Sequence, residues 1–388
     1  MEFRRAKRGE LGEIVDFINM VFSMEECPHQ FRTLLPKLYE NGALTERFHY
    51  ICIENGKIKG VVCMLPIQLE YKGKQLKCGT VGSVAVHPDL REKGCMKQLM
   101  EIALADMKEQ GMALSCLSGQ RQRYAYYGYE KLGDGYYYSI QKANIIHSSR
   151  KFPVLSLELK NSKEEELDEL YGIYESKEIK VLREREKFFS ICRSWDGNMI
   201  TIRNEKKIIG YLCVSHSRIL ECVIEDEKYL FSVLAEYLKM KRLEEVSIIV
   251  QAYDWKRQSI LQEIAESCSL QAGVNYRIFD YKKVLEFYFE VKMEYDQLEE
   301  GTLAFIVKKI DGKEEMIEIQ VKENQVSIFN FDYINAVDKE DKYILVSEKE
   351  LMQIAFSNCP IWEGEKRYIQ KYKGWFPLPL GITGQDLC

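Results

Sequence analysis

The order of apolar and polar residues predicts alternating helices and strands over the first 150 residues. Two stripes recur every 3.6 residues, as on one buried helix face. They are Leu11, Ile14, Val15, Ile18 and Phe22, and then Phe31, Leu34, Leu35 and Leu38. Two hairpins follow, in which apolar runs flank turns at Asn55-Gly56 and at Lys72-Gly73-Lys74. The first part of the chain is therefore expected to be a mixed α/β unit.

A strand, a glycine-containing loop and a long helix are predicted next. The strand Val81–Val86 runs into a turn at Pro88, and Gly94 lies just before the helix. The apolar face of this helix consists of Met96, Leu99, Met100, Ala103, Leu104 and Met107. A helix start favours an anion, because its first N–H groups are unpaired and its dipole is positive there. Gly94 allows close approach of a ligand, and the cations Arg91, Lys93 and Lys97 suit a pyrophosphate.

The next buried strand is predicted over Ala113–Ser118, and a tyrosine-rich segment follows it. That segment spans residues 121–129, after Gly119-Gln120. A further apolar run, Tyr136–Ile140, is expected to close the same sheet.

These two segments resemble the signatures of the GNAT acetyltransferases. Arg91-x-x-Gly94 is similar to the Arg/Gln-x-x-Gly-x-Gly/Ala loop that holds the pyrophosphate of acetyl-CoA, with Met96 at the second small position. Tyr124 together with Tyr127-Gly128-Tyr129 resembles Tyr-x-x-Phe-Gly-Phe/Tyr, whose first tyrosine faces the thioester sulfur. Motif spacing favours Tyr124 for that role, and Tyr126 is its competitor.

Residues 151–283 repeat this order of elements in weaker form. Helices are expected around Leu167–Ile173, Tyr229–Lys239 and Ile260–Ile264, and strands at Met199–Ile202, Ile208–Val214, Ile219–Ile224 and Val246–Val250. The junction that corresponds to the phosphate loop, residues 224–228, has no glycine and three acidic residues. It would repel a pyrophosphate. We interpret this part as a degenerate GNAT-like domain, and an unrelated α/β domain is the alternative.

Residues 284–388 differ in character from both preceding parts. Strands are predicted at Val284–Met293, Gly301–Lys308, Glu318–Lys322, Val326–Phe329 and Tyr343–Ser347, and a helix at Glu348–Phe356. The tail carries the aromatic residues Trp362, Tyr368, Tyr372, Trp375 and Phe376. Of these, Trp375 and Phe376 are the candidate anchors for the chain end.

The whole arrangement resembles the enhanced intracellular survival (Eis) acetyltransferases. The resemblance implies an α/β (α+β) fold with an active GNAT domain (1–150), a degenerate one (151–283) and a sterol-carrier-like domain (284–388) whose tail returns to the active site. In that branch the loop reads Arg-x-x-Gly-x-Leu/Met, which accommodates Met96. The resemblance also implies acetyl-CoA as cosubstrate, no metal and a homo-oligomer.

Residue roles carried over from the resemblance form one set. The cofactor contacts are Val84, Ala85, Val86, Arg91, Glu92, Lys93, Gly94, Cys95, Met96, Lys97, Gly119 and Gln120. Tyr124 maps onto the general acid. The general base maps onto the α-carboxylate of Cys388, provided that this residue is the natural end. The Cys388 thiol is a weaker candidate as nucleophile, because no histidine neighbours it in sequence.

Composition narrows the function further. The formal net charge of −5 gives no positive field for nucleic acid, and no apolar run is long enough for a membrane span. The twelve cysteines form no C-x-x-C pair, so their spacing favours a reducing cytoplasm over a zinc or redox site.

The acceptor is expected to be an amine, either a small molecule or a lysine side chain. Such an acceptor is cationic, and the candidate acidic contacts are Glu25, Glu26 and Asp386. Two other functions remain open: a non-catalytic acyl-CoA or lipid-binding protein, and an aminoacyl transferase of the Fem type. Aminoacyl transferases of the Fem type lack the Arg-x-x-Gly loop that this chain keeps.

Overall fold

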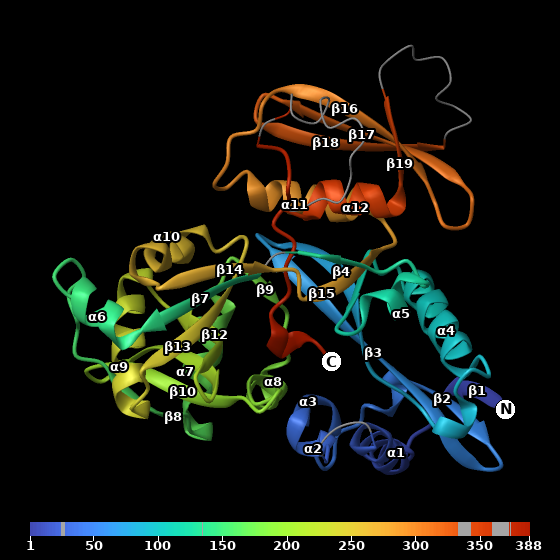
Figure 1. The fold of residues 1–388 in the computed structure, drawn as a ribbon, viewed down its shortest axis with the longest axis horizontal. Coiled ribbons are helices and arrows are strands. Elements are labelled where there is room, and N and C mark those ends of the chain that lie inside the picture. Colours follow the sequence, from blue (N-terminus) through green and yellow to red (C-terminus); the bar gives the residue numbers. More distant parts are fainter. Residues whose placement is uncertain (25–27, 134, 333–342, 359–371, 373) are drawn as a thin grey trace.

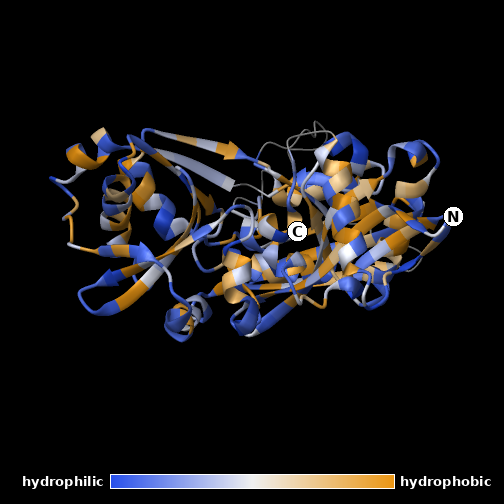
Figure 2. Cartoon of the chain, turned by 90° about the horizontal axis from the view of Figure 1, so that it is seen from below, coloured by the Kyte–Doolittle hydropathy of each residue, from blue (hydrophilic) through white to orange (hydrophobic). Residues whose placement is uncertain are grey.

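The computed structural model describes residues 1–24, 28–133, 135–332, 343–358, 372 and 374–388. Figure 1 shows a mixed α/β architecture with two large sheets side by side and a smaller sheet packed against one end of them. Hydrophobic residues gather on the strands and on the helix faces that meet them (Figure 2). Within the described ranges, no helix is both long and apolar enough to cross a membrane.

The first sheet contains the predicted hairpins. Its strand order is β1-β2-β3-β4-β5-β15-β6, and β9 also pairs with β3. The strands are β1 (Glu2–Arg5), β2 (His49–Glu54), β3 (Lys57–Tyr71), β4 (Lys74–Val86), β5 (Leu114–Leu117), β6 (Glu130–Leu132), β9 (Ile179–Val181) and β15 (Val274–Ile278). Its helices are α1 (Leu11–Ser23), α2 (Phe31–Leu34), α3 (Pro36–Tyr39), α4 (Cys95–Glu109) and α5 (Arg121–Ala125).

The apolar faces of α1 and α4 were correctly predicted, whereas the single helix expected over residues 31–38 was wrong. The chain leaves helical geometry at Leu35, whose φ is −131°. Pro36 disfavours helical geometry in the residue before it, so the helix divides into α2 and α3.

The second sheet has the order β8-β10-β11-β12-β13-β7-β14. Its strands are β7 (Gly135–Gln141), β8 (Glu158–Asn161), β10 (Asn198–Asn204), β11 (Lys207–Ser215), β12 (Arg218–Ile224), β13 (Glu245–Gln251) and β14 (Ser267–Gln271). The helices around it are α6 (Lys142–Ser148), α7 (Leu167–Glu175), α8 (Phe188–Cys192), α9 (Leu230–Lys241) and α10 (Trp255–Ile264). Each element expected in residues 151–283 is present.

The two sheets are built alike, down to their irregularities. The β2–β3 hairpin shifts register next to Gly60, and the β10–β11 hairpin shifts register next to Gly210. A second shift occurs in β3–β4 and in β11–β12, just where the following parallel strand ends its pairing. β-Bulges keep their positions within a fold family. Because the register shifts lie at matching places in both sheets, the two parts are structural repeats.

The repeats exchange one strand each. The expectation that Tyr136–Ile140 closes the first sheet was wrong, because β7 lies in the second sheet between β13 and β14. In the matching place of the first sheet, between β5 and β6, lies β15 from the later repeat. The apolar pattern specifies a strand but not its partner. A division of the sequence near residue 150 therefore does not divide the sheets.

The C-terminal part is a four-stranded sheet covered by two helices. Its order is β18-β17-β16-β19, with strands β16 (Gly301–Lys308), β17 (Glu314–Lys322), β18 (Gln325–Asp332) and β19 (Tyr343–Ser347) and helices α11 (Tyr281–Lys292) and α12 (Glu348–Phe356). Its likeness to a sterol carrier stays a prediction.

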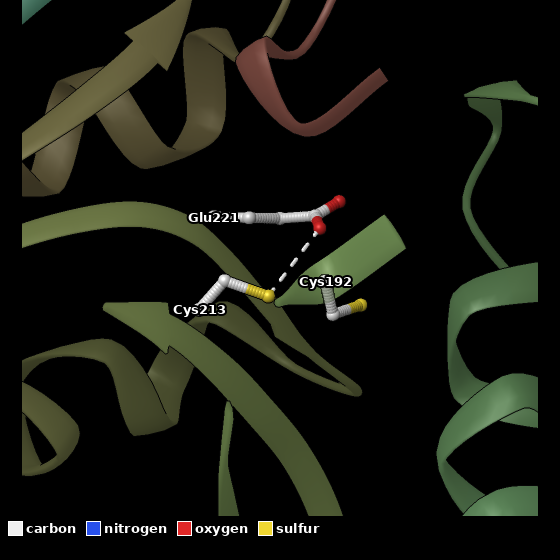
Figure 3. Close-up of side chains that lie close together, drawn as sticks. All are labelled: Cys192, Cys213 and Glu221. Carbon is white, nitrogen blue, oxygen red and sulfur yellow. Dashed lines mark hydrogen bonds between the residues drawn. The ribbon is translucent and has the colours of Figure 1, made fainter. Parts of the chain in front are cut away.

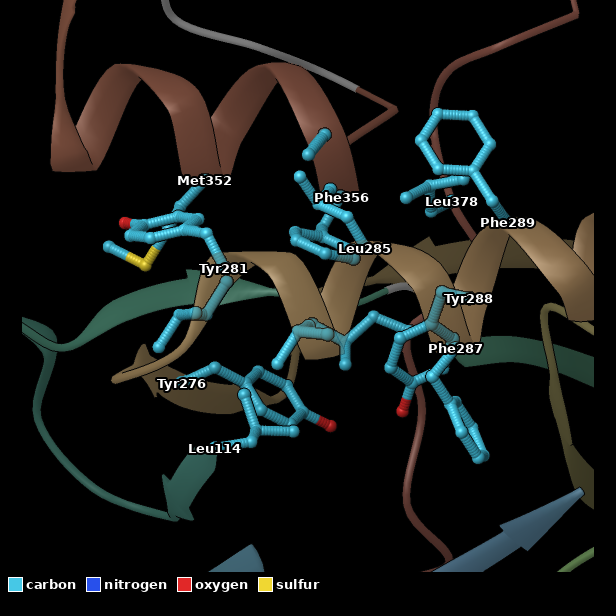
Figure 4. Close-up of a cluster of buried hydrophobic side chains, with 14 of the residues drawn as sticks. Leu114, Tyr276, Tyr281, Leu285, Phe287, Tyr288, Phe289, Met352, Phe356 and Leu378 are labelled. Atoms are coloured by element: carbon cyan, nitrogen blue, oxygen red, sulfur yellow. The ribbon is translucent and has the colours of Figure 1, made fainter. Parts of the chain in front are cut away.

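The strand expected at Val284–Met293 was wrong, because these residues belong to helix α11. Asp280 caps its start by accepting from the backbone N–H of Lys283. The helix is buried on most sides, between the first sheet and α12 (Figure 4). Its run of valine, phenylalanine and tyrosine is typical of a strand, whereas its charged residues Lys282, Glu286 and Glu290 follow the four-residue spacing of a helix.

Candidate active site

Strands β4 and β5 diverge at the centre of the first repeat. They pair in parallel from Cys78 and Leu114 to Val81 and Leu117, and no further. β4 continues to Val86, so residues 82–86 have no strand partner on their β5 side within the described part of the chain. Ser83, with φ of +48°, lies at the bulge of β4 and redirects the strand there.

A cavity of about 650 Å³ opens along this free part of β4. It is lined by Val21, Phe22, Val84, Ala85, Val86, Leu90, Arg91, Glu92, Gly94, Cys95, Met96, Lys97 and Arg123. Nine of these are predicted cofactor contacts, which the fold brings together on one wall. Sequence reasoning missed the α1 residues Val21 and Phe22, as well as Leu90 and Arg123.

The start of α4 lies at this cavity and favours an anion there. Gly94 precedes the helix with φ of +78°, and a Cβ there would have no atom within 4 Å. The left-handed backbone favours glycine, and the absence of a side chain leaves this space open to a ligand. Arg91, Lys97 and Arg123 bring cations to the helix start, where N–H groups lack intrahelical partners. These residues fit the pyrophosphate of acetyl-CoA.

Tyr124 packs at the end of β5, whereas Tyr126 points outward. The ring of Tyr124 lies against Gly119, where a Cβ would be 2.6 Å from Cε2. Tyr124 is 5% exposed and Tyr126 is 64% exposed. Burial raises the pKa of Tyr124, so its hydroxyl stays protonated at neutral pH. Gly119, Gln120, Lys93 and Tyr124 are not among the residues that line the cavity.

The exchanged strand β15 adds a side chain that the sequence did not point to. Asn275 is fully buried and donates from Nδ2 to the carbonyls of Leu117 (3.4 Å) and Gly119 (3.1 Å). Among the described residues, its Oδ1 has no hydrogen-bond partner. A buried acceptor without a partner is costly, so a ligand N–H would be favoured at this end of β5.

The last residue lies at the same divergence of β4 and β5. Cys388 is 5% exposed. A Cβ on Gly82 would be 2.5 Å from the carboxyl oxygen of Cys388 and 2.9 Å from its Sγ. Gly82 is the first residue of β4 beyond the paired part. The chain end therefore occupies the space that the absent side chain leaves.

A buried lysine and a tryptophan hold the backbone of the tail. Lys37 Nζ donates to the carbonyls of Gln385 and Leu387, each at 2.5 Å. Trp195 Nε1 donates to the same Leu387 carbonyl at 3.2 Å. Burial lowers the pKa of Lys37 to about 8, against the opposing effect of Asp386. The ammonium remains largely protonated at neutral pH beside the chain end.

The Cys388 thiol is turned toward β4. Its Sγ donates to the Thr80 carbonyl at 3.1 Å, and Thr80 Oγ1 lies 3.0 Å from it. Burial alone would raise the pKa of this thiol, but hydrogen bonds with Cys63 and Thr80 and the charge of Lys37 bring it down to about 7. These bonds point the sulfur into the sheet, which favours the carboxylate over the thiol as the reacting group.

Asp386 is fully engaged in an ion pair. Arg183, whose side chain is completely buried, binds both oxygens of Asp386 at 2.8 and 2.9 Å and both oxygens of Glu221 at 3.0 and 3.2 Å. This pairing favours a role in holding the tail over contact with a cationic acceptor. The other two acidic candidates, Glu25 and Glu26, lie outside the described residues.

Glu221 also lies close to two thiols, in a group that could in principle hold a metal ion (Figure 3). Cys213 Sγ donates to Glu221 Oε2 at 3.8 Å, and Cys192 completes the group. However, Arg183 already binds both Glu221 oxygens and lies 3.7 Å from the Cys192 sulfur. A guanidinium in that place repels a cation, so the group is better described as part of the Arg183 ion-pair network.

The family model described as an acetyltransferase (GNAT) domain matches residues 2–135. The matched segment contains β4, the loop at Gly94, α4 and Tyr124. The chain therefore contains a GNAT acetyltransferase domain, and the class of enzyme that this domain defines is the N-acetyltransferases. A comparison with curated proteins finds no match.

Solved structures resemble the chain over most of its length. A GCN5-related N-acetyltransferase from Anabaena variabilis has 14% identity and a TM-score of 0.66, with 98% of each chain covered. Eis1 from Mycobacterium abscessus has 12% identity and a TM-score of 0.56, with 85% of each chain covered. A probable N-acyltransferase of unknown function from Enterococcus faecalis has 16% identity and a TM-score of 0.62, and the match covers 89% of the present chain and 87% of the other chain. The fold as a whole is thus shared with GNAT proteins, Eis among them.

Proposed function

We propose that this protein transfers the acetyl group of acetyl-CoA to a primary amine. The observation that carries the proposal is the cavity along the free part of β4, which ends at the cationic start of α4 and lies next to the chain end. Acetyl-CoA would supply the activated acetyl group. The backbone of Val84–Val86 would pair with the pantetheine amides, since it has no strand partner there.

The pyrophosphate would be held at the opposite end of the cavity. Arg91, Lys97 and Arg123 provide positive charge, and the first N–H groups of α4 provide donors. Lys93, Gly119 and Gln120 complete the proposed contacts. Asn275 would accept a ligand N–H at the end of β5 through its free Oδ1.

Tyr124 is the proposed general acid. Its buried hydroxyl remains protonated because burial raises the pKa. It would donate that proton to the departing CoA sulfur, so that the leaving group does not have to exist as a free thiolate. A positioned acid of this kind contributes about 10²–10⁴-fold in rate.

The α-carboxylate of Cys388 is the proposed general base. An attacking amine must lose a proton, and a terminal carboxylate with an ordinary pKa of about 3.5 is ionised at neutral pH. Lys37 binds the adjacent carbonyls and would keep this group in place.

We also propose that the protein is a homo-oligomer, which light scattering after gel filtration would test. We further propose that it works in a reducing cytoplasm, because the described cysteines are free thiols.

A screen for acetyl transfer tests the function. Purified protein, whose last residue is verified by intact mass, is mixed with acetyl-CoA and polyamines, aminoglycosides or a lysine peptide, and thiol release is followed. We expect turnover with at least one amine and one acetyl-CoA site per chain by calorimetry. Gly94→Gln should abolish binding, because it strains the backbone at φ +78° and fills the helix start. Binding without turnover on any amine would favour the non-catalytic acyl-CoA-binding alternative.

A further inference from the structure

The second repeat has its own divergence of parallel strands. β12 pairs with β13 at Arg218–Ser247 and Ile219–Ile248, and the pairing then stops. The register shift of β12 against β11 falls between Ile219 and Glu221. β12 continues to Ile224 and β13 to Gln251. This place corresponds to the divergence of β4 and β5 that forms the proposed acetyl-CoA site in the first repeat.

An arginine occupies the outer part of this second divergence. Arg257 of α10 donates to the Cys222 carbonyl of β12 at 2.7 Å, and both Glu227 oxygens bind its guanidinium. In the first repeat the corresponding stretch of β4 lies open along the cavity. The side chain of Arg257 thus takes up the backbone acceptor that a pantetheine amide would need.

The chain's own tail occupies the inner part. Gly381 packs against the side chain of Gln251, the last residue of β13. The short helix Gly384–Asp386 follows. Figure 1 shows this segment, in red, running down between the two large sheets.

The tail is fixed to the second repeat by buried polar contacts. Gln385 Nε2 donates to the carbonyls of Cys192 and Ser194, each at 2.9 Å. Asp386 is joined to Glu221 of β12 through Arg183, as described above. Gln385 and Asp386 are 1% and 4% exposed. Buried charges that are paired and doubly hydrogen-bonded hold one geometry, because loss of either partner is strongly destabilising.

We propose that the second repeat has become a receptor for the chain's own tail, and that Arg183, Gln385 and Asp386 position the terminal residue in the first repeat. Cys388 lies two positions after Asp386, so the terminal Cα stays within about 7 Å of the fixed point. Lys37 and Trp195 both bind the Leu387 carbonyl and so fix the orientation of the last two residues. This inference rests on the proposed function for its catalytic consequence, but not for its geometry.

Asp386→Asn is the first test, because it keeps the shape and removes the charge, while Arg183 keeps Glu221 as a partner. The first readout needs no activity: carboxypeptidase should release Cys388 and Leu387 at least about 10-fold faster than from the unaltered protein, since a freed terminus is digested in proportion to its opening. The second readout is kinetic. We expect kcat to fall about 10²-fold, as for a misplaced reacting group, with the Kd of acetyl-CoA unchanged.

Three further variants keep the test decisive. Asp168→Asn removes an exposed partner of Arg185 in the same repeat and should change neither readout. Gln385→Met loses both bonds to the carbonyls of Cys192 and Ser194 without removing a charge and should also speed release. Arg183→Lys keeps the charge and should restore part of kcat relative to Arg183→Met.

A combined variant separates positioning from stability. In a chain that lacks residues 387–388, Asp386→Asn should cause no further loss of kcat. Unchanged release in folded Asp386→Asn and Gln385→Met proteins, or faster release with full kcat, would overturn the proposal. If the unaltered protein acetylates no amine, the proposed function fails, while the carboxypeptidase result still reports whether the second repeat holds the tail.

Discussion

Replacing Gly82 by alanine moves the chain end without touching any other proposed catalytic group. The added Cβ would lie 2.5 Å from the carboxyl oxygen of Cys388, whereas ordinary contact begins at 3.4 Å. The terminal residue must therefore retreat by about 1 Å. The φ of Gly82 lies outside the left-handed region, so the backbone itself tolerates alanine.

The expected cost follows from this displacement. A reacting group misplaced by about 1 Å loses about 10²-fold in rate, which corresponds to about 2.7 kcal/mol in the activation barrier. Initial rates of thiol release at saturating acetyl-CoA and amine measure kcat, and calorimetry measures the Kd of acetyl-CoA. We expect a loss in kcat of that size and an unchanged Kd, because the new methyl group points toward the chain end.

Gly384→Ala is the matched control. This glycine belongs to the same tail, but its added Cβ would have no atom within 4 Å, and its φ is also outside the left-handed region. It should keep full kcat. If Gly82→Ala also keeps full kcat while remaining folded, the position of the chain end does not set the rate, and the assignment of the base is refuted.

Other outcomes test the remaining groups. Tyr124→Phe should lower kcat by about 10²–10⁴-fold with little change in acetyl-CoA binding, whereas full activity of Tyr124→Phe and loss in Tyr126→Phe would reverse the assignment. Cys388→Ala should keep much of the activity, whereas deleting Leu387 and Cys388 should remove most of it; equal rates would make the tail passive. Burial lowers the pKa of His49 to about 4, and an unfolded histidine titrates near 6.5. Between pH 6.5 and pH 4 this histidine is protonated in the unfolded chain but not in the folded protein. The free energy of unfolding should therefore decrease as the pH is lowered through this range, by at most about 3 kcal/mol. His49→Gln should remove that part of the pH dependence when the free energy of unfolding is measured by urea titration. The same pH dependence in His49→Gln and in the unaltered protein would contradict this expectation.

Local signals explain which elements could be predicted. The turn Asn55-Gly56 and the apolar face of α4 depend on residues close in sequence, and both matched the structure. The cavity wall around Gly94 was predictable for the same reason, since loop and helix are adjacent. The break before Pro36 was also encoded locally, but the apolar stripe across it concealed the break.

Long-range placement could not be read from the pattern. The alternation in residues 136–140 indicates a strand, yet it does not state which sheet the strand joins, and β7 joined the second. Asn275 reaches the Gly119 carbonyl at the end of β5 because β15 crosses over in the other direction. Helix α11 is rich in valine, phenylalanine and tyrosine, residue types that favour strands, and its packing against the first sheet and α12 overrides that preference. The return of the tail to β4 was an expectation from resemblance alone.

The crossing of β15 into the first sheet also has a consequence for synthesis of the chain. At 5–20 residues per second, residue 274 leaves the ribosome roughly 8–30 s after β5. Until then β5 lacks the strand that lies beside it, and β6, which pairs with β15 in the described structure, lacks its partner. An unpaired strand edge can recruit other nascent chains. We therefore expect stalled chains that end before residue 274 to bind chaperones, and acetyl-CoA affinity to arise late in translation.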